Sequence, residues 1–330
     1  MRYKLNRSLC RKESVILYNG TPERSTCLAR AQTVSVDELK SIAKRIRRHI
    51  VEMTANANSG HPGGSLSSVE IATALYFRAL RYDPKNPLWP DRDRFIVSKG
   101  HATPMVYSTM AEAGYFPVED LMTFRKLGGK LQGHTIMHKP PGVEMSAGAL
   151  GMGLSFSLGH ALAGRLDGRD YHVFCLLSDG DCQEGQTWEA AMASAHHRAE
   201  NLIAIVDRNH IQNDGFSDYQ RFPDGNGSRP QRPGGWVLKD GHTANIMNLE
   251  PIEDKWKAFG WSTQHIDGHD FEAIIESLEK AKGHTGGPSV VICETIKGKG
   301  VSFMENNPDF HGKAPSPEQL EQALKELADD

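Results

Sequence analysis

Residues 172–186 read HVFCLLSDGDCQEGQ, an apolar run followed by small and acidic residues and then by the start of a helical pattern. A short apolar run of this kind is typical of a strand that is covered on both faces. The Ser, Gly and Asp residues behind it indicate a loop at the carboxyl end of that strand. We therefore predict a buried strand through Leu177, a loop after it, and a helix from about residue 186.

Similar alternation continues along the chain. Further β-rich runs lie at 94–97, 202–206, 262–266 and 289–294, and helical patterns lie near 152–166, 186–199, 251–259 and 271–282. Strands that alternate with helices predict an α/β fold: a doubly wound, mostly parallel sheet with helices on both faces. Such sheets bind ligands beyond the carboxyl ends of their strands. The loops after Leu177, Val206 and Glu294 are therefore the first places to look for a site.

The expected domain spans residues 34–330. Residues 1–33 are basic and irregular, and we expect them to form a disordered extension. Ser35–Glu38 matches a capping box at the start of a helix, and Ser67–Glu70 predicts a second one that opens a helix through Leu80. Residues 216–248 are rich in Gly, Pro, Asp and Asn and interrupt the alternation, which predicts an inserted loop.

Composition excludes some classes of function. The chain has 330 residues and a formal net charge of −3, which gives no reason to expect nucleic acid or an anionic membrane as a partner. It contains no apolar stretch long enough to span a bilayer. The five cysteines are widely spaced and include no CxxC pair, which favours reduced thiols in a cytoplasmic protein.

Two polar residues follow neighbouring strands of the predicted sheet. Asp179 comes after the strand that ends at Leu177, and Asn209 comes after the one that ends at Val206. A carboxylate and an amide oxygen at adjacent strand ends can share one hard cation. Gly180 allows a ligand to approach the backbone, and the amides that open the helix near Glu184 favour an anion. Another interpretation makes Asp179 and Asp207 helix N-caps and Asn209 a turn residue.

Four of the 15 histidines lie in loops beside glycine or other small residues. Their contexts are SGHPG around His61, KGHA around His101, QGHT around His134 and FHGK around His311. Glycine beside histidine indicates a backbone that is shaped around a ligand. A zinc site is a competing idea, although the sequence has no HExxH motif and no Cys/His pairing.

The spacing from Asp179 to Asn209 is 209 − 179 = 30 residues, and it resembles the motif of thiamine-diphosphate enzymes, in which Gly-Asp-Gly and a spacer of about 30 residues precede Asn. Between about residues 34 and 316, a series of blocks resembles the transketolase family in particular. These blocks include SGHPGGSLS (59–67), SKGHA (98–102), LQGH (131–134), PGVEMSAGALGMGLS (141–155), LLSDGDCQEGQTWEAA (176–191), NLIAIVDRN (201–209), IDGHDFE (266–272) and TIKGKGVSFMENNPDFHGKAP (295–315).

The resemblance implies roles for individual residues. Asp179, Asn209 and the backbone carbonyl of Ile211 would hold Mg²⁺, or Ca²⁺ or Mn²⁺, against the diphosphate of thiamine diphosphate. His61 and His134 would contact sugar oxygens, while His101 and His311 would lie at the diphosphate and the reacting carbon. The other cofactor-binding positions implied are Gly148 and Leu150 at the aminopyrimidine, Gly180 and Lys297 near the diphosphate, and Glu184 between paired active sites.

The family also implies a reaction and a partner. A transketolase passes a two-carbon ketol unit from a ketose phosphate to an aldose. Full-length members continue into a pyrimidine-binding domain that carries a glutamate needed by the cofactor, and this sequence contains no second sheet domain. We therefore expect the N-terminal subunit of a split transketolase, which forms an α2β2 assembly with a C-terminal subunit.

Four departures from the family pattern keep alternatives open. Ser178 and Thr135 replace a glycine and a proline, Ala149 lies in the pyrimidine-contact turn, and Asn213 replaces an isoleucine near the thiazole ring. The alternatives are the α subunit of a thiamine-dependent 2-oxo acid dehydrogenase and a non-catalytic module of the same fold. Arg221, Arg229, Arg232 and Lys239 in the inserted loop are candidates for contacting a phosphate or sulfonate.

Overall fold

The computed structural model describes residues 34–213, 215–216, 236–237, 243–244 and 247–328. The predicted extension at 1–33 lies outside the described residues, as do the four basic residues of the inserted loop. Among the described residues, no helix is both long and apolar enough to cross a membrane.

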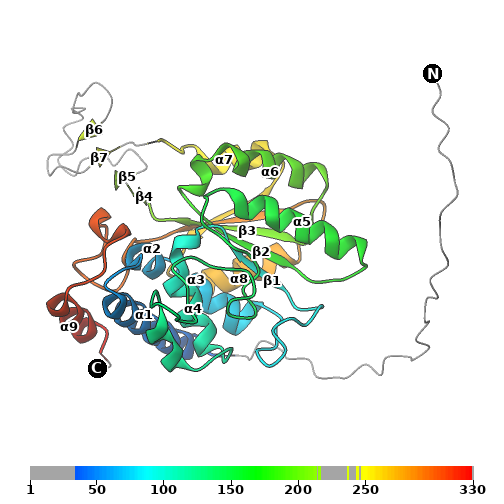
Figure 1. Ribbon diagram of the computed structural model, residues 1–330. Coiled ribbons are helices and arrows are strands. Elements are labelled where there is room, and N and C mark those ends of the chain that lie inside the picture. Colours follow the sequence, from blue (N-terminus) through cyan, green and yellow to red (C-terminus); the bar gives the residue numbers. More distant parts are fainter. Residues whose placement is uncertain (1–33, 214, 217–235, 238–242, 245–246, 329–330) are drawn as a thin grey trace, which may run out of the picture.

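The centre of the fold is a sheet of five strands (Figure 1). In spatial order these are β1 (Arg94–Val97), β2 (Val173–Ser178), β3 (Leu202–Arg208), β9 (Ser289–Glu294) and β8 (Ser262–Asp267). Every neighbouring pair is parallel. Each β-rich run predicted as a strand therefore forms one, and the predicted parallel sheet is confirmed.

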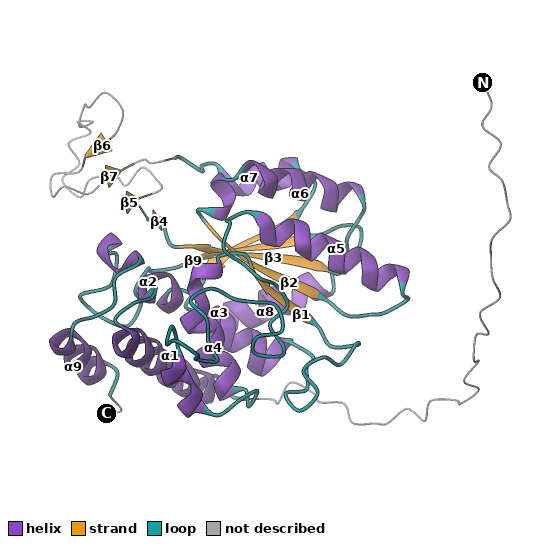
Figure 2. Cartoon of the chain, viewed as in Figure 1, coloured by secondary structure: helices purple, strands orange, loops and turns teal. Residues whose placement is uncertain are grey.

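Helices cover both faces of the sheet (Figure 2). One layer contains α1 (Val36–Ala57), α3 (Val69–Ala74), α4 (Thr103–Glu112) and α8 (Phe271–Lys282), and the other contains α5 (Met152–Leu166), α6 (Gly185–His196) and α7 (Ile252–Ala258). Helix α2 (Pro62–Leu66) lies near the carboxyl edge of the sheet, and α9 (Pro317–Glu326) packs beside α1.

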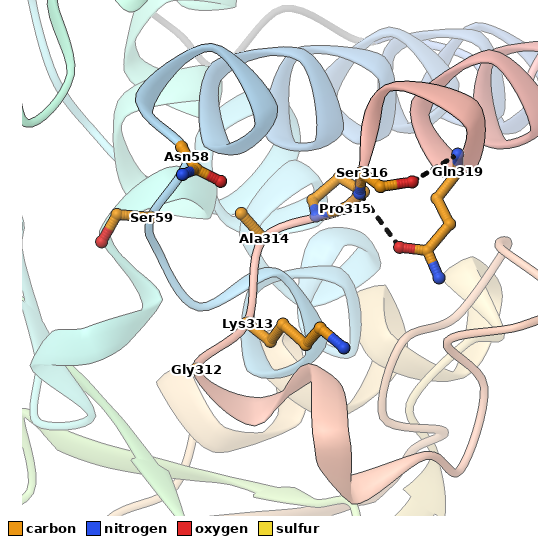
Figure 3. Close-up of a pocket in the computed structure, with 8 residues that line it drawn as sticks. All are labelled: Asn58, Ser59, Gly312, Lys313, Ala314, Pro315, Ser316 and Gln319. Carbon is orange, nitrogen blue, oxygen red and sulfur yellow. Dashed lines mark hydrogen bonds between the residues drawn. The ribbon is translucent and has the colours of Figure 1, made fainter.

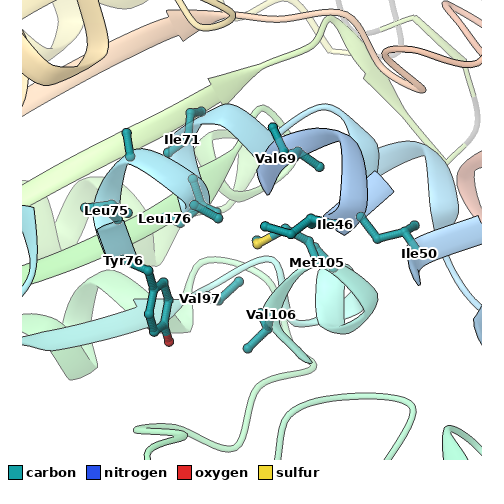
Figure 4. Close-up of a cluster of buried hydrophobic side chains, with 14 of the residues drawn as sticks. Ile46, Ile50, Val69, Ile71, Leu75, Tyr76, Val97, Met105, Val106 and Leu176 are labelled. Atoms are coloured by element: carbon teal, nitrogen blue, oxygen red, sulfur yellow. The ribbon is translucent and has the colours of Figure 1, made fainter. Parts of the chain in front are cut away.

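Alternate residues of β1, β2, β3 and β9 enter the two apolar cores, as the period of two for a strand requires. In β2, Phe174 and Leu176 pack with α1, α3 and α4, whereas Val173, Cys175 and Leu177 pack with α5 and α6. Figure 4 shows part of the first core, where Leu176 lies among side chains of α1, α3 and α4. Because both faces are covered, β2 and β9 are apolar along most of their length, whereas the edge strand β8 is polar and only partly buried.

One predicted helix start is correct and one is wrong. Ser35 caps α1 by accepting a bond from the amide of Glu38 (3.2 Å). Ser67 does not begin a helix, because its hydroxyl donates to the buried carboxylate of Asp207 (2.7 Å). Helix α3 begins at Val69 and continues as a π-helical turn over Leu75–Ala79, so the segment through Leu80 is helical but is not one α-helix.

Two short antiparallel pairs follow β3. The strands β4 (Ile211–Gln212) and β5 (Gly215–Phe216) pair with each other, and β6 (Trp236–Val237) pairs with β7 (Thr243–Ala244). The remainder of the predicted insertion at 216–248, apart from the last two of its residues, lies outside the described residues.

Candidate active site

Four strands of the sheet end at one edge, and the residues that follow them form the candidate site. Lys99 follows β1, Asp179 follows β2, Asn209 follows β3 and Thr295 follows β9. The register places Ser178 beside Asp207 and Arg208 beside Glu294. Parallel pairing therefore brings four loops together although they are far apart in the sequence.

Asp179 is buried, with 1% of its surface exposed. Its carboxylate accepts bonds from the amides of Asn209 (3.2 Å) and His210 (2.6 Å) and forms an ion pair with Arg208 (3.0 Å). Neither Asp179 nor Asp207 is the N-cap of a helix. The structure thus brings Asp179 against the loop that carries Asn209 and Ile211, instead of placing it at a helix start.

The three predicted metal ligands offer only oxygen atoms. The Asn209 Oδ1 atom accepts the amide of Ile211 (3.2 Å), and the Ile211 carbonyl accepts a bond from the Lys297 Nζ atom (2.8 Å). A carboxylate, an amide oxygen and a carbonyl suit a hard cation such as Mg²⁺ or Ca²⁺. This set contains only one carboxylate, and no group of three or more His, Cys, Asp or Glu that could hold a metal ion occurs among the described residues.

A buried polar cluster supports this loop, and the sequence reasoning missed it. Asp207, which is fully buried, forms an ion pair with the Lys99 ammonium. Its carboxylate also accepts bonds from the hydroxyls of Ser67 and Thr295 and from the Asn209 side-chain amide (3.0 Å). Because Asp207 takes the Asn209 amide nitrogen, the Asn209 oxygen is oriented away from Asp207.

The four predicted histidines form one cluster. The ring centroid of His61 lies 5.4 Å from that of His101, 5.9 Å from that of His134 and 5.6 Å from that of His311. The His101 and His311 centroids are 5.0 Å apart. His61 comes from the loop before α2, and His101 from the turn after β1, so only the fold brings these rings together.

The surroundings keep these imidazoles neutral at pH 7. Burial, followed by the charge of Arg125, lowers the pKa of His61 to about 4. Burial is also the largest cause of the lowered pKa values of His101, His134 and His311, and positive neighbours lower them further. A neutral imidazole has one nitrogen that accepts a hydrogen bond and one that donates it. Each ring of the cluster can therefore accept one hydrogen bond and donate another.

Two polar groups of the site bear on ligand binding: a buried lysine that links the Ile211 loop to the histidine cluster, and a buried ring nitrogen that lacks a partner. Lys297 lies between the Ile211 carbonyl and the His311 Nδ1 atom (2.8 Å), and burial lowers the pKa of Lys297 to about 7. When Lys297 is protonated, its N–H donates to His311 Nδ1, and the proton of His311 then lies on Nε2. The Nδ1 atom of His61 is buried, and it has no partner among the described residues. Buried polar atoms are rarely left without a partner, so a bound group is expected here.

The remaining predicted cofactor residues lie at the neighbouring rim. Gly148 and Glu184 are exposed. Leu150 packs against Gly180, where an added Cβ atom would lie only 3.1 Å from a Leu150 methyl group, so Gly180 allows this close approach. The Leu150 carbonyl accepts a bond from Gln186 (3.2 Å) at the start of α6. Gly148 and Glu184 therefore lie on the surface, whereas Leu150 and Gly180 are half-buried and contact each other.

The sequence matches the family described as transketolase, thiamine diphosphate binding domain, over residues 38–229 and 235–329. The chain belongs to this transketolase family. The match decides against the α subunit of a 2-oxo acid dehydrogenase. Two relatives are 40% identical to this chain. One is a subunit of the apulose-4-phosphate transketolase of Actinobacillus succinogenes, matched over 90% of this chain and 98% of the relative. The other is the 6-deoxy-6-sulfo-D-fructose transketolase subunit SqwG of a Clostridium species, matched over 88% of this chain and 96% of the relative.

Solved transketolases have the same fold as this chain. The transketolase of Campylobacter jejuni matches with a TM-score of 0.76 at 30% identity, over 89% of this chain and 43% of that one. The Pichia stipitis transketolase in complex with sedoheptulose 7-phosphate matches with a TM-score of 0.76 at 30% identity, over 88% of this chain and 40% of that one. The chain thus spans about two fifths of the length of these solved transketolases.

Two departures from the transketolase pattern have a structural explanation. The Ser178 hydroxyl donates to Asp181 (2.9 Å), whose carboxylate also accepts the amide of Gly151 (2.7 Å). Thr135 accepts the amide of Ala147 through both its carbonyl (3.1 Å) and its hydroxyl (3.3 Å). Ala149 and Asn213 are exposed, and nothing in the structure explains these two substitutions.

Proposed function

We propose that this chain is the diphosphate-binding subunit of a two-subunit, cytoplasmic transketolase, arranged as α2β2. It would transfer a two-carbon ketol unit from a ketose phosphate to an aldose with thiamine diphosphate and Mg²⁺. The two relatives at 40% identity are named as subunits of transketolases, and this chain covers 96% or more of each. Those names support a partner subunit that supplies the pyrimidine-binding domain.

One observation carries the proposal: the buried loop of Asp179, Asn209 and Ile211 lies beside four neutral histidines, and Lys297 contacts both. The oxygen ligands suit a divalent cation, and Lys297 provides positive charge for a diphosphate, whereas the Lys99 ammonium is paired with Asp207. The buried Nδ1 atom of His61 gives a substrate hydroxyl a partner. The site therefore combines a place for an anionic cofactor with groups that exchange protons.

Each protein group has a task in this reaction. When bound, thiamine diphosphate supplies the carbanion and the electron sink. His101 and His311 exchange the hydroxyl proton that moves in each half-reaction, and they do so as neutral bases. Protonated Lys297 holds His311 in the form that carries its proton on Nε2. His61 and His134 orient the sugar through hydrogen bonds to its hydroxyl groups.

The first test concerns the partner. The purified chain with thiamine diphosphate and Mg²⁺ should show no ketol transfer from xylulose 5-phosphate, because the proposal assigns the other part of the cofactor site to the partner subunit. Addition of a pyrimidine-domain subunit, taken from the same genome, should restore transfer in a coupled assay. Turnover by the purified chain alone would contradict the two-subunit proposal.

The second test concerns the proton-exchanging histidines. His101→Ala or His311→Ala should lower kcat about 10²–10⁴-fold in the assembled enzyme, the usual contribution of one general acid or base. His197→Ala, at an exposed position after α6, is the matched control and should keep normal turnover. Unchanged melting temperatures would show that folding is intact. Near-normal rates in both site variants would remove these roles.

A further inference from the structure

The candidate site has a cavity at His311 and a loop at the end of β3. The cavity, of about 610 Å³, opens between Ser59 and the start of α9 (Figure 3). The loop carries Asn209 and Ile211, and neither residue is among those that line the cavity. The conformation of this loop decides whether its two proposed metal ligands can face one cation.

His210, which lies between those two ligands, has a backbone conformation that residues with a side chain rarely adopt. Its φ angle is +64°, in the left-handed region where a Cβ atom crowds a backbone carbonyl oxygen. In this conformation the His210 amide donates to one carboxylate oxygen of Asp179 (2.6 Å), while the Asn209 amide donates to the other (3.2 Å). The arrangement of the loop therefore depends on His210 staying in a conformation that glycine adopts more readily.

The His210 ring is held from outside the loop by Glu294, the last residue of β9. The His210 Nε2 atom lies 2.6 Å from one carboxylate oxygen of Glu294, and the ring donates because an ionised carboxylate only accepts. The Nε2 atom of His265, on β8, lies 2.7 Å from the other oxygen. Both oxygens of Glu294 are therefore bound. Glu294 itself is fixed in the sheet, where it pairs in register with Arg208 and Asp267.

We infer that Glu294 is a positioning residue for the proposed metal site. By holding the His210 ring, it keeps the chain from Asn209 to Ile211 in the form in which their oxygens can face the same cation. The contact with the ring offsets the cost of the positive φ angle. The inference rests on the proposed function, because the cation is the one that would hold the diphosphate. It adds an acidic residue outside the ligand set on which the affinity for that cation depends.

The test measures the affinity for Mg²⁺ and does not rely on turnover. Titration calorimetry of thiamine diphosphate into the assembled enzyme, at a series of Mg²⁺ concentrations, gives the apparent Kd of Mg²⁺. Glu294→Ala and His210→Ala should each raise this Kd about 10–100-fold, the usual effect of removing a group that orients a metal ligand. Glu294→Gln keeps an oxygen that can accept the His210 N–H, and it should restore most of the affinity. Glu276→Ala, at an exposed carboxylate on α8, is the matched control and should leave the Kd unchanged.

The His210→Gly variant separates positioning from a direct effect of charge. It removes the ring but adopts a positive φ angle without strain, so it should bind Mg²⁺ more tightly than His210→Ala. Adding Glu294→Ala to His210→Gly should raise the Kd no further, since the carboxylate then has no ring to hold. Equal melting temperatures without Mg²⁺ and cofactor would show that the variants are folded. If Glu294→Ala did not fold, the comparison of His210→Ala with His210→Gly would still decide.

Three results would overturn the inference while leaving the proposed function intact. They are an unchanged Kd in Glu294→Ala, an equal rise when Glu294→Ala is added to His210→Gly, and a His210→Gly variant that binds Mg²⁺ as weakly as His210→Ala. A wild-type assembly that bound thiamine diphosphate without any need for Mg²⁺, or did not bind it at all, would instead contradict the proposed function itself.

Discussion

Asp179→Asn is expected to abolish the Mg²⁺-dependent binding of thiamine diphosphate. The substitution keeps the shape of the side chain but removes the only carboxylate among the three predicted metal ligands. Changes outside the ligand set already lower metal affinity about 10–100-fold in characterised sites, so loss of a direct ligand should cost at least as much. The Ile211 carbonyl and Asn209 oxygen alone would give a neutral, weak site.

A melting experiment measures this without relying on turnover. At about 100 times its Kd, a ligand stabilises the folded protein by about 2.7 kcal/mol, so cofactor with Mg²⁺ should raise the melting temperature of the wild-type assembly. Asp179→Asn should remove that rise. Asp170→Asn is the control, because the Asp170 carboxylate is 83% exposed and pairs with Arg81 at the surface. A full rise in Asp179→Asn would exclude Asp179 as a metal ligand.

The fold could be predicted because its sheet is buried on both faces. Strands such as β9 are apolar along most of their length, and this pattern separates them from the amphipathic helices between them. The error at Ser67 has a different origin. A capping rule assumes that the hydroxyl bonds a nearby amide, whereas Ser67 bonds Asp207, which lies 140 residues further along the chain.

The site was predictable where its signal is local. Asp179 and Asn209 lie at strand ends in a motif with a fixed spacing, and four histidines lie beside small residues. Lys99 and Asp207 were missed because their pairing spans 108 residues. Each looks ordinary in its own segment, a lysine before a glycine and an aspartate at a strand end. Only the sheet order β1-β2-β3-β9 brings them together.

The Lys99–Asp207 pair leads to the second large expected effect. Lys99→Met should lower the free energy of unfolding by about 3–5 kcal/mol, since it leaves the Asp207 carboxylate buried without its counter-charge. Urea unfolding of the purified chain measures the change. The double variant Lys99→Met/Asp207→Asn should lose less than the sum of the two single variants, because it removes both charges and keeps one of the two oxygens that accept bonds from Ser67 and Thr295.

The pH dependence of the free energy of unfolding shows whether Lys99 stabilises the fold through its charge or by filling space. Burial alone would raise the pKa of Asp207, but the Lys99 ammonium and the hydroxyls of Thr295 and Ser67 lower it overall. A carboxyl whose pKa is lower in the folded state stabilises the fold above its unfolded pKa, about 3.9, and this contribution disappears as the pH falls through the folded value. The difference in stability between wild type and Lys99→Met should therefore be largest near pH 7 and narrow below about pH 4. A difference that stays constant from pH 7 to pH 3 would mean that Lys99 stabilises the site by filling space and not by its charge.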